Sequence, residues 1–157
     1  MDEDASNFDA SEKTFIENVR NHGWSGTHVV VEDEWAGFSY STGFWYKFQA
    51  PELVLFSIPV EAAHQILWNF YEELESGKRF SDNVPVSEIL EGYDVVLMPV
   101  LQEHFSEYLG WNRWFYRGDH FQAQQVFFPD KSGQFPWDAA VIPEFNIMLP
   151  NLTKLDQ

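Results

Sequence analysis

The chain contains no cysteine, few basic residues and no long apolar run. Without cysteine it cannot form disulfides, use a thiolate in catalysis or hold zinc or iron–sulfur clusters through sulfur, and a reducing compartment is favoured. No apolar segment is long enough to cross a bilayer, and the N-terminus is acidic where a secretory signal is basic and then apolar. We therefore expect a cytoplasmic protein.

The scarcity of basic residues also limits the partners of the chain. Lysine and arginine total 9 against 25 aspartate and glutamate, so the formal net charge is −16 at pH 7. A charge of this sign repels phosphate backbones and anionic membranes at long range. We expect neither nucleic acid nor a membrane as partner, whereas a basic protein would be attracted. Acidic residues also serve solubility alone, and charge by itself favours that simpler interpretation.

The chain does have enough apolar material for one packed domain. Its 157 residues are 45% hydrophobic and 22% charged, which is the balance of a globular protein. We predict a disordered acidic tail over residues 1–10 and a single domain over residues 11–157. Aromatic residues make up 18% of the chain, with 15 phenylalanines and 7 tryptophans. This exceeds what the core of such a fold must hide, so we expect some rings on a binding surface.

Hydrophobic spacing and turn residues predict the order of the elements. The predicted elements are a helix over 11–22 capped by Ser11, a hairpin of strands over 27–31 and 35–41, a central strand over 52–58, a long helix over 59–76, a strand over 94–100, a short helix over 101–109 ended by Gly110, and a strand over 121–128. Segment 78–88 is interpreted as a surface connection, and the type of segment 111–116 is left open.

These elements predict the fold class. The early strands are joined as hairpins, and regular β-α-β alternation is absent from the sequence pattern. We therefore predict an α+β fold with a mainly antiparallel sheet and helices packed on one side. A rolled or partly closed sheet stays open as the alternative.

Several phrases of the sequence occur together in a recognisable order. They are Gly23-Trp24, the segments 38–44, 51–56 and 92–95, and the segment 125–130 followed by Gly133, Phe135, Pro136 and Trp137. In this combination the chain resembles the bacterial domain of unknown function numbered 4262, over about residues 15–140. The resemblance implies a small bacterial cytoplasmic domain to which no reaction is assigned. Ser41 departs from the family phrase, in which threonine is expected after tyrosine, and this leaves the turn intact.

Common metal, nucleophile and cofactor motifs are missing from the sequence. None of the five histidines forms a His-x-His, His-x-x-x-His or His-Glu-x-x-His pattern. His104 with its neighbouring glutamates, and Asp119 with His120, are better explained as a solvated helix face and a charged loop. Nucleophile elbows, Ser-x-x-Lys, Gly-x-Gly-x-x-Gly and P-loops do not occur either. We predict no metal site and no cofactor, assign no catalytic residue, and favour a protein that is not an enzyme.

Two aromatic segments are the strongest candidates for a binding surface. Segment 40–48 crowds rings around Gly43, where glycine lets the backbone turn. Two arginines flank the aromatic residues 114–116, and guanidinium groups beside rings can hold an anionic ligand or a partner's carboxylate. The candidate ligand- or partner-binding residues are Tyr40, Gly43, Trp45, Arg113, Tyr116, Arg117 and His120. The alternative places these rings in the core and pairs the arginines with local acids.

Other residues of these phrases are predicted to have structural roles. They are Pro51, Gln125, Pro129, Asp130, Gly133 and Trp137. Proline, aspartate and glycine stand in segment 129–133 where a reverse turn needs them, and the Asp130 side chain can bond the amides of that turn. Trp137 is then placed to cover one end of the sheet.

Two functions fit these observations. The first is a non-catalytic module that binds a basic protein, as immunity proteins bind basic toxins, and it rests on the charge and the aromatic excess. The second is an enzyme or sensor for a small molecule, with a pocket between sheet and helix. Its candidate lining residues are Tyr40, Trp45, Arg113, Tyr116 and His120. The second function requires those side chains to converge on one cavity. The oligomeric state stays open.

Overall fold

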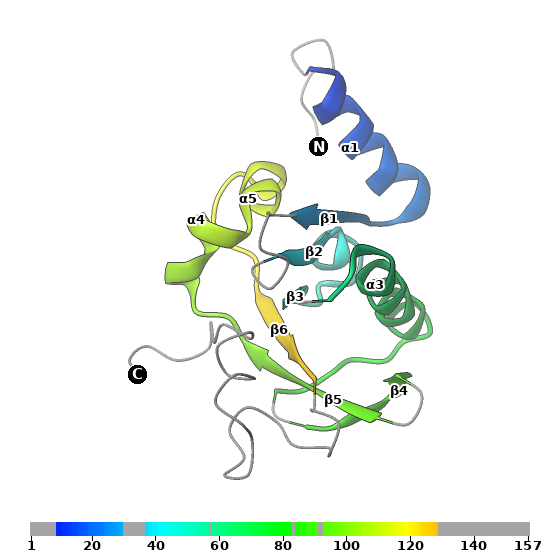
Figure 1. Ribbon diagram of the computed structural model, residues 1–157. Helices are drawn as coiled ribbons and strands as arrows, with labels where there is room; N and C mark the ends of the chain where they lie inside the picture. Colours follow the sequence, from blue (N-terminus) through cyan, green and yellow to red (C-terminus); the bar gives the residue numbers. More distant parts are fainter. Residues whose placement is uncertain (1–8, 30–36, 57, 83, 91–92, 129–157) are drawn as a thin grey trace.

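The computed structural model of the chain describes residues 9–29, 37–56, 58–82, 84–90 and 93–128 (Figure 1). The strands are β1 (Ser25–Val29), β2 (Phe38–Thr42), β3 (Glu52–Phe56), β4 (Val86–Leu90), β5 (Tyr93–Pro99) and β6 (Ala123–Phe127). The helices are α1 (Ala10–His22), α2 (Phe44–Phe48), α3 (Val60–Glu75), the 3-10 turn η3 (Gln102–His104), α4 (Phe105–Tyr108) and α5 (Gly110–Tyr116).

The six strands form one open sheet in the order β1-β2-β3-β6-β5-β4. Neighbouring strands are antiparallel except β3 and β6, which run parallel in the middle of the sheet. The predicted α+β class, the mainly antiparallel sheet and the central position of β3 are therefore confirmed. The parallel pair sets the start of β3 beside the start of β6, with Glu52 opposite Ala123.

Helices cover both faces of this sheet, which is more than the one covered side that we expected. The reason lies in β3, whose residues are all buried. Leu53 and Leu55 join the apolar cluster under α3, whereas Val54 and Phe56 join a second cluster with α1, α4 and α5. In Figure 1, α4 and α5 accordingly lie on the other side of the sheet from α3. An uninterrupted apolar strand is typical of a strand buried on both faces.

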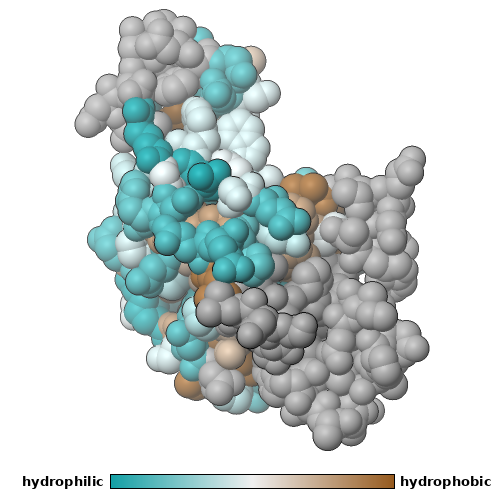
Figure 2. Space-filling view, turned by 90° about the vertical axis from the view of Figure 1, so that its left-hand side faces the viewer, coloured by the Kyte–Doolittle hydropathy of each residue, from teal (hydrophilic) through white to brown (hydrophobic). Residues whose placement is uncertain are grey.

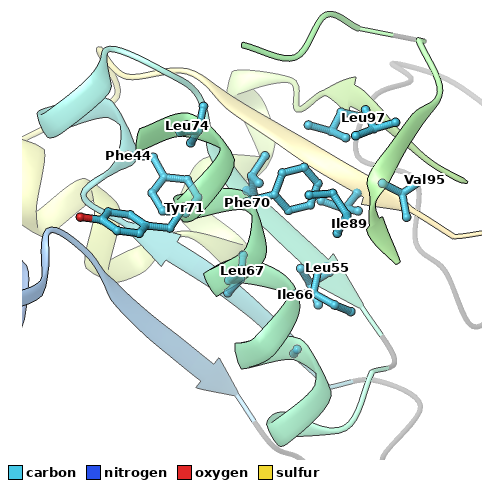
Figure 3. Close-up of a cluster of buried hydrophobic side chains, with 14 of the residues drawn as sticks. Phe44, Leu55, Ile66, Leu67, Phe70, Tyr71, Leu74, Ile89, Val95 and Leu97 are labelled. Atoms are coloured by element: carbon cyan, nitrogen blue, oxygen red, sulfur yellow. The ribbon is translucent and has the colours of Figure 1, made fainter. Parts of the chain in front are cut away.

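The long helix α3 packs its apolar stripe onto the first face. Its buried residues are Ala63, Ile66, Leu67, Phe70, Tyr71 and Leu74, spaced as one side of a helix requires. Figure 3 shows this stripe meeting side chains of β3, β4 and β5, and all of them belong to one cluster. The helix begins after Pro59, which suits a helix start because its missing N–H is not needed there.

Most aromatic rings of the described residues lie inside the molecule rather than on its surface. Phe44, Phe70 and Phe127 are fully buried, and stacked or edge-on ring pairs occur in both clusters. The large exposed ring side chains among the described residues are Tyr46, 57% exposed, and Trp68, 38% exposed. Figure 2 shows the side of the molecule on which α4 lies, where hydrophilic residues predominate and hydrophobic ones emerge in small areas. In the part of the chain that the structure describes, the aromatic rings are therefore mainly core material.

The structure corrects three local predictions. The segment interpreted as a surface connection ends in strand β4, an edge strand whose irregular register with β5 interrupts the alternation that would have revealed it. Gly110 is the first residue of α5, whereas the preceding helix α4 ends at Tyr108 with Leu109 as its C-cap. The N-cap of α1 is Asp9 rather than Ser11. The Asp9 side chain accepts from the N–H of Glu12 at 2.8 Å, and the Glu12 side chain accepts from the N–H of Asp9 at 3.0 Å.

Two further observations bear on the sequence predictions. Within the ranges that the structure describes, no helix is long and apolar enough to span a membrane. The predicted structural residues Pro129, Asp130, Gly133 and Trp137, like most of the predicted tail, lie outside the described residues.

The packing of α3 gives a first testable prediction. Phe70 is fully buried between α3 and the sheet, so Phe70→Ala should lower the free energy of unfolding by about 3–5 kcal/mol, because it removes apolar contacts and leaves a cavity. Glu72→Ala, at an exposed position of the same helix, should change it by less than about 0.5 kcal/mol. Urea unfolding followed by tryptophan fluorescence measures both, and equal losses would contradict this account of the core.

Candidate functional site

A hollow of about 1000 Å³ opens at one end of the sheet, where β3 and β6 begin and β5 ends. Its apolar lining includes Phe48, Leu53, Leu74, Phe80, Val100, Phe105 and Phe121, and its polar lining includes Gln49, Arg79, Ser81, Asp82, Gln102, Asp119, His120, Gln122 and Gln124. These residues come from five separate stretches of the chain. The hollow, which we call the sheet-end cavity, thus exists only in the folded molecule.

The charged groups of the sheet-end cavity are already bonded to the protein. Arg79 donates to the carbonyl oxygens of Leu74, Lys78 and Phe48 at 2.7 to 3.2 Å. Asp82 accepts from the Gln124 amide at 2.7 Å. These bonds hold the side chains in place and reduce the charge that a ligand would meet.

Another part of the cavity lining, residues 119–124, contains a further charge that the protein itself compensates. Asp119 accepts from Nε of Arg113 at 2.6 Å, and its backbone oxygen accepts from the Gln102 amide at 3.0 Å. His120 follows and is exposed at the rim. Two residues predicted from the sequence therefore lie at Asp119. Arg113 forms an ion pair with its carboxylate, and His120 is the next residue in the chain.

Behind the cavity wall lies a buried carboxylate, Glu52, at the first position of β3. Its side chain has no exposed surface. Oε1 accepts from the Ser41 hydroxyl at 2.7 Å and from the N–H of Phe44 at 3.2 Å. Oε2 accepts from the N–H groups of Gly43 and Trp45 at 2.9 and 3.2 Å. The carboxylate therefore faces the first turn of α2, where a negative charge is favoured.

Tyr116 of α5 completes this arrangement. Its hydroxyl donates to Oε2 of Glu52 and accepts from the N–H of Tyr46 at 3.1 Å. Burial and the nearby carboxylate raise the pKa of Tyr116 far above its usual value, so the phenol stays protonated and remains a donor. Next to it, the Thr42 hydroxyl donates to Oδ1 of the buried Asn112. We call Glu52 and its five donors the Glu52 network.

The protonation of Glu52 reflects two opposed effects. Complete burial raises the pKa of Glu52 to about 6, although the hydrogen bonds from Tyr116, Ser41 and the α2 amides lower it. The larger effect is therefore desolvation. At neutral pH the carboxylate is ionised, and near pH 6 it is poised to take up a proton.

Gly43 has a backbone role that fits the prediction of a turn. Its φ of +124° favours glycine, and a Cβ there would lie 2.7 Å from the carbonyl oxygen of Gly23 and 2.8 Å from Cα of Trp24. A side chain would therefore displace backbone atoms, and the hydrogen bond from the N–H of Gly43 to Glu52 would be lost.

The remaining predicted residues lie apart from the sheet-end cavity. Tyr40 is buried and its hydroxyl accepts from the N–H of Trp111 at 3.0 Å, whereas the side chain of Trp45 packs half-buried against the second cluster. Arg117 ends α5 in the left-handed conformation.

Of the predicted structural residues that the structure describes, Pro51 lines the cavity and Gln125 is buried in β6. Three of the predicted binding residues contact Glu52, namely Gly43, Trp45 and Tyr116. The described lining of the cavity does not include Tyr40 or Trp45.

Sequence reasoning overlooked the central member of this site. Glu52 was included in an apolar strand, although a carboxylate at the start of a buried central strand is itself a notable feature. Ser41 was noted only as a departure from a family phrase, and Asn112 was not singled out. The pairing of Glu52 with Tyr116, 64 positions later, leaves no local pattern.

The fold and this geometry define a small α+β domain with an open sheet, a cavity at the sheet end and a buried carboxylate behind it. The chain belongs to the family described as Domain of unknown function (DUF4262), whose family model matches residues 18–141. This confirms the resemblance identified from the sequence phrases. No curated protein and no solved structure matches the chain.

The Glu52 network gives a prediction about pH. The pKa of Glu52 is raised from 4.5 to about 6 on folding, so the folded state binds the proton more tightly than the unfolded state does. This preference stabilises the fold fully when the pH is below the unfolded pKa, and the stabilisation is lost as the pH rises through the folded pKa. Between pH 4 and 7 the free energy of unfolding of the wild type should fall by roughly 2 kcal/mol relative to Glu52→Gln, which cannot titrate.

Urea unfolding at a series of pH values measures this difference. Glu72→Gln, at an exposed position of α3, is the matched control, and its stability should follow that of the wild type across the range. A difference between wild type and Glu52→Gln that stays constant with pH would contradict the raised pKa.

Proposed function

We propose that this domain binds an uncharged, partly aromatic organic molecule in the sheet-end cavity. The observation that carries the proposal is the cavity itself, whose volume of about 1000 Å³ is large enough for a small organic ligand. Rings and aliphatic groups form much of its lining, which suits a flat apolar surface. The proposal keeps the second function that the sequence suggested, although of its five candidate lining residues only His120 belongs to the lining that the structure describes.

The polar groups of the cavity support an uncharged ligand. Four glutamine side chains line it. Three of their amide nitrogens already donate within the protein, so these three offer their carbonyl oxygens as acceptors to a neutral polar molecule. The charged groups Arg79, Asp82 and Asp119 are engaged by the protein itself. An anionic ligand would also meet the repulsion of a chain with net charge −16.

We propose binding and not catalysis. The carboxylates in the described lining, Asp82 and Asp119, are each bonded to a side chain of the protein itself, and this pairing supports binding more than acid–base chemistry. Glu52, a carboxylate whose pKa burial raises to about 6, is fully enclosed behind the wall. Its contacts support a role in positioning the wall.

A cavity-filling variant tests this proposal. Gln122 lines the cavity and is exposed, so Gln122→Trp should fill part of the space without entering the core. Gln65→Trp makes the same exchange on the exposed surface of α3 and is the control. The probes are uncharged ring compounds, namely adenosine, uridine, riboflavin and tryptophanamide in its neutral form.

At a free concentration of 100 times its Kd, a bound probe should stabilise the wild type and Gln65→Trp by about 2.7 kcal/mol, which raises Tm by several degrees. In Gln122→Trp this shift should be lost. If the shift is equal in all three proteins, the probe binds elsewhere, and if no probe shifts the wild type, this ligand class is wrong.

A second candidate function is recognition of a basic protein, in the manner of an immunity protein. The observation that favours it is the solvent face of α3, where Glu61, Glu72 and Glu75 are exposed beside Trp68. Acidic groups around an accessible ring suit a surface rich in lysine and arginine. The mostly buried aromatic residues give less support to this function than the sequence suggested.

Charge reversal on α3 tests this second function. Glu72→Lys should weaken capture of a basic partner from native lysate, and wild-type capture should weaken steeply with added salt. Glu107→Lys, an equal charge change at an exposed position on α4, should have the smaller effect. If a partner stays bound at high salt, and if both variants capture it equally well, recognition through this face is contradicted.

A further inference from the structure

Two histidines face one small space above Gly26, at the edge of the sheet. His28 lies on the edge strand β1 and His64 on α3, with ring centroids 5.6 Å apart and planes at 52°. A Cβ on Gly26 would lie 3.2 Å from Nδ1 of His64 and 3.4 Å from Nε2 of His28. Both nitrogens therefore border the same point, which stays open because residue 26 has no side chain.

Each ring is held in its orientation by a neighbour. Nδ1 of His28 lies 2.7 Å from the Ser39 hydroxyl oxygen, which leaves Nε2 for the space above Gly26. His64 stacks on Trp24 at 5.1 Å and 26°. A hydrogen bond to the second ring nitrogen is the usual way in which proteins orient a histidine that binds a metal. His28 is half-buried and His64 exposed, so the space is accessible from solvent.

We propose that His28 and His64 form a binding site for a divalent transition metal of the Cu²⁺ or Zn²⁺ kind. Imidazole nitrogens suit these ions, and Cu²⁺ binds such ligands most tightly. Two imidazoles at a metal–nitrogen distance of about 2.0–2.1 Å place their ring centres roughly 5 Å apart in tetrahedral geometry, close to the observed separation. A net charge of −16 attracts cations to the surface.

The small number of protein ligands defines what kind of site this is. Within the described ranges, no cluster of three or more histidine, aspartate or glutamate side chains could hold a metal ion. The two imidazoles therefore leave coordination positions for water or for a donor group of another molecule. This site is made by the opposite end of α3 from the sheet-end cavity, and it does not depend on the function proposed for that cavity.

Cu²⁺ and Zn²⁺ titration of the untagged chain tests the proposal. Trp24 reports Cu²⁺ through fluorescence quenching, because it stacks on His64, and calorimetry gives the affinity for both ions. His28→Ala and His64→Ala should each weaken binding at least about tenfold, and Ser39→Ala by about tenfold through loss of ring orientation. Gly26→Ala should weaken it as well, because the methyl group would lie 3.2 and 3.4 Å from the two ring nitrogens and would crowd an ion bound between them.

His22→Ala, which removes an exposed histidine at the end of α1, is the control and should bind as the wild type does. The electron paramagnetic resonance spectrum of the Cu²⁺ form should show nitrogen ligands in the wild type and lose one in His64→Ala. The proposal is overturned if the wild type binds neither ion, if His28→Ala and His64→Ala keep wild-type affinity, or if His22→Ala loses as much. His64 is exposed, so its variant keeps the test decisive even if Gly26→Ala does not fold.

Discussion

The buried carboxylate of Glu52 joins the parts of this fold that the chain itself connects only at a distance. A carboxylate removed from water is very costly unless donors surround it. Five donors do so here, and they come from β2, the first turn of α2 and α5. Removing one donor leaves the charge buried with incomplete compensation, so these elements are constrained to assemble together.

Helix α2 depends most directly on this constraint. It has five residues, and its N-cap residue, Gly43, has no side chain that could accept from the N–H groups of the first turn. A helix this short gains little stability from its own hydrogen bonds. The Glu52 carboxylate supplies the missing acceptor from a neighbouring strand. The sharp turn at Gly43 is needed to point the amides at that acceptor.

The sequence predicted well what local pattern decides. Three elements could be predicted from a pattern within their own segment, namely α3 from its apolar stripe, β3 from its uninterrupted apolar run and β6 from its short apolar segment. The edge strand β4 was missed because its register is irregular. The sheet-end cavity and the Glu52 network were beyond reach for another reason. Their residues come from distant stretches that only the parallel pairing of β3 with β6 brings together.

The cavity and the network are two sides of one piece of backbone. The N–H of Glu52 donates to the carbonyl oxygen of Gln122 at 2.9 Å, and the ring of Tyr116 packs against Phe121 at 5.1 Å. The wall of the cavity over residues 121–123 is thus held by the same residues that hold the carboxylate. Because the cavity's own charges are compensated locally, contact inside it depends on shape and hydrogen bonding. The acidic surplus of the chain acts over longer distances, on the approach of other charged molecules.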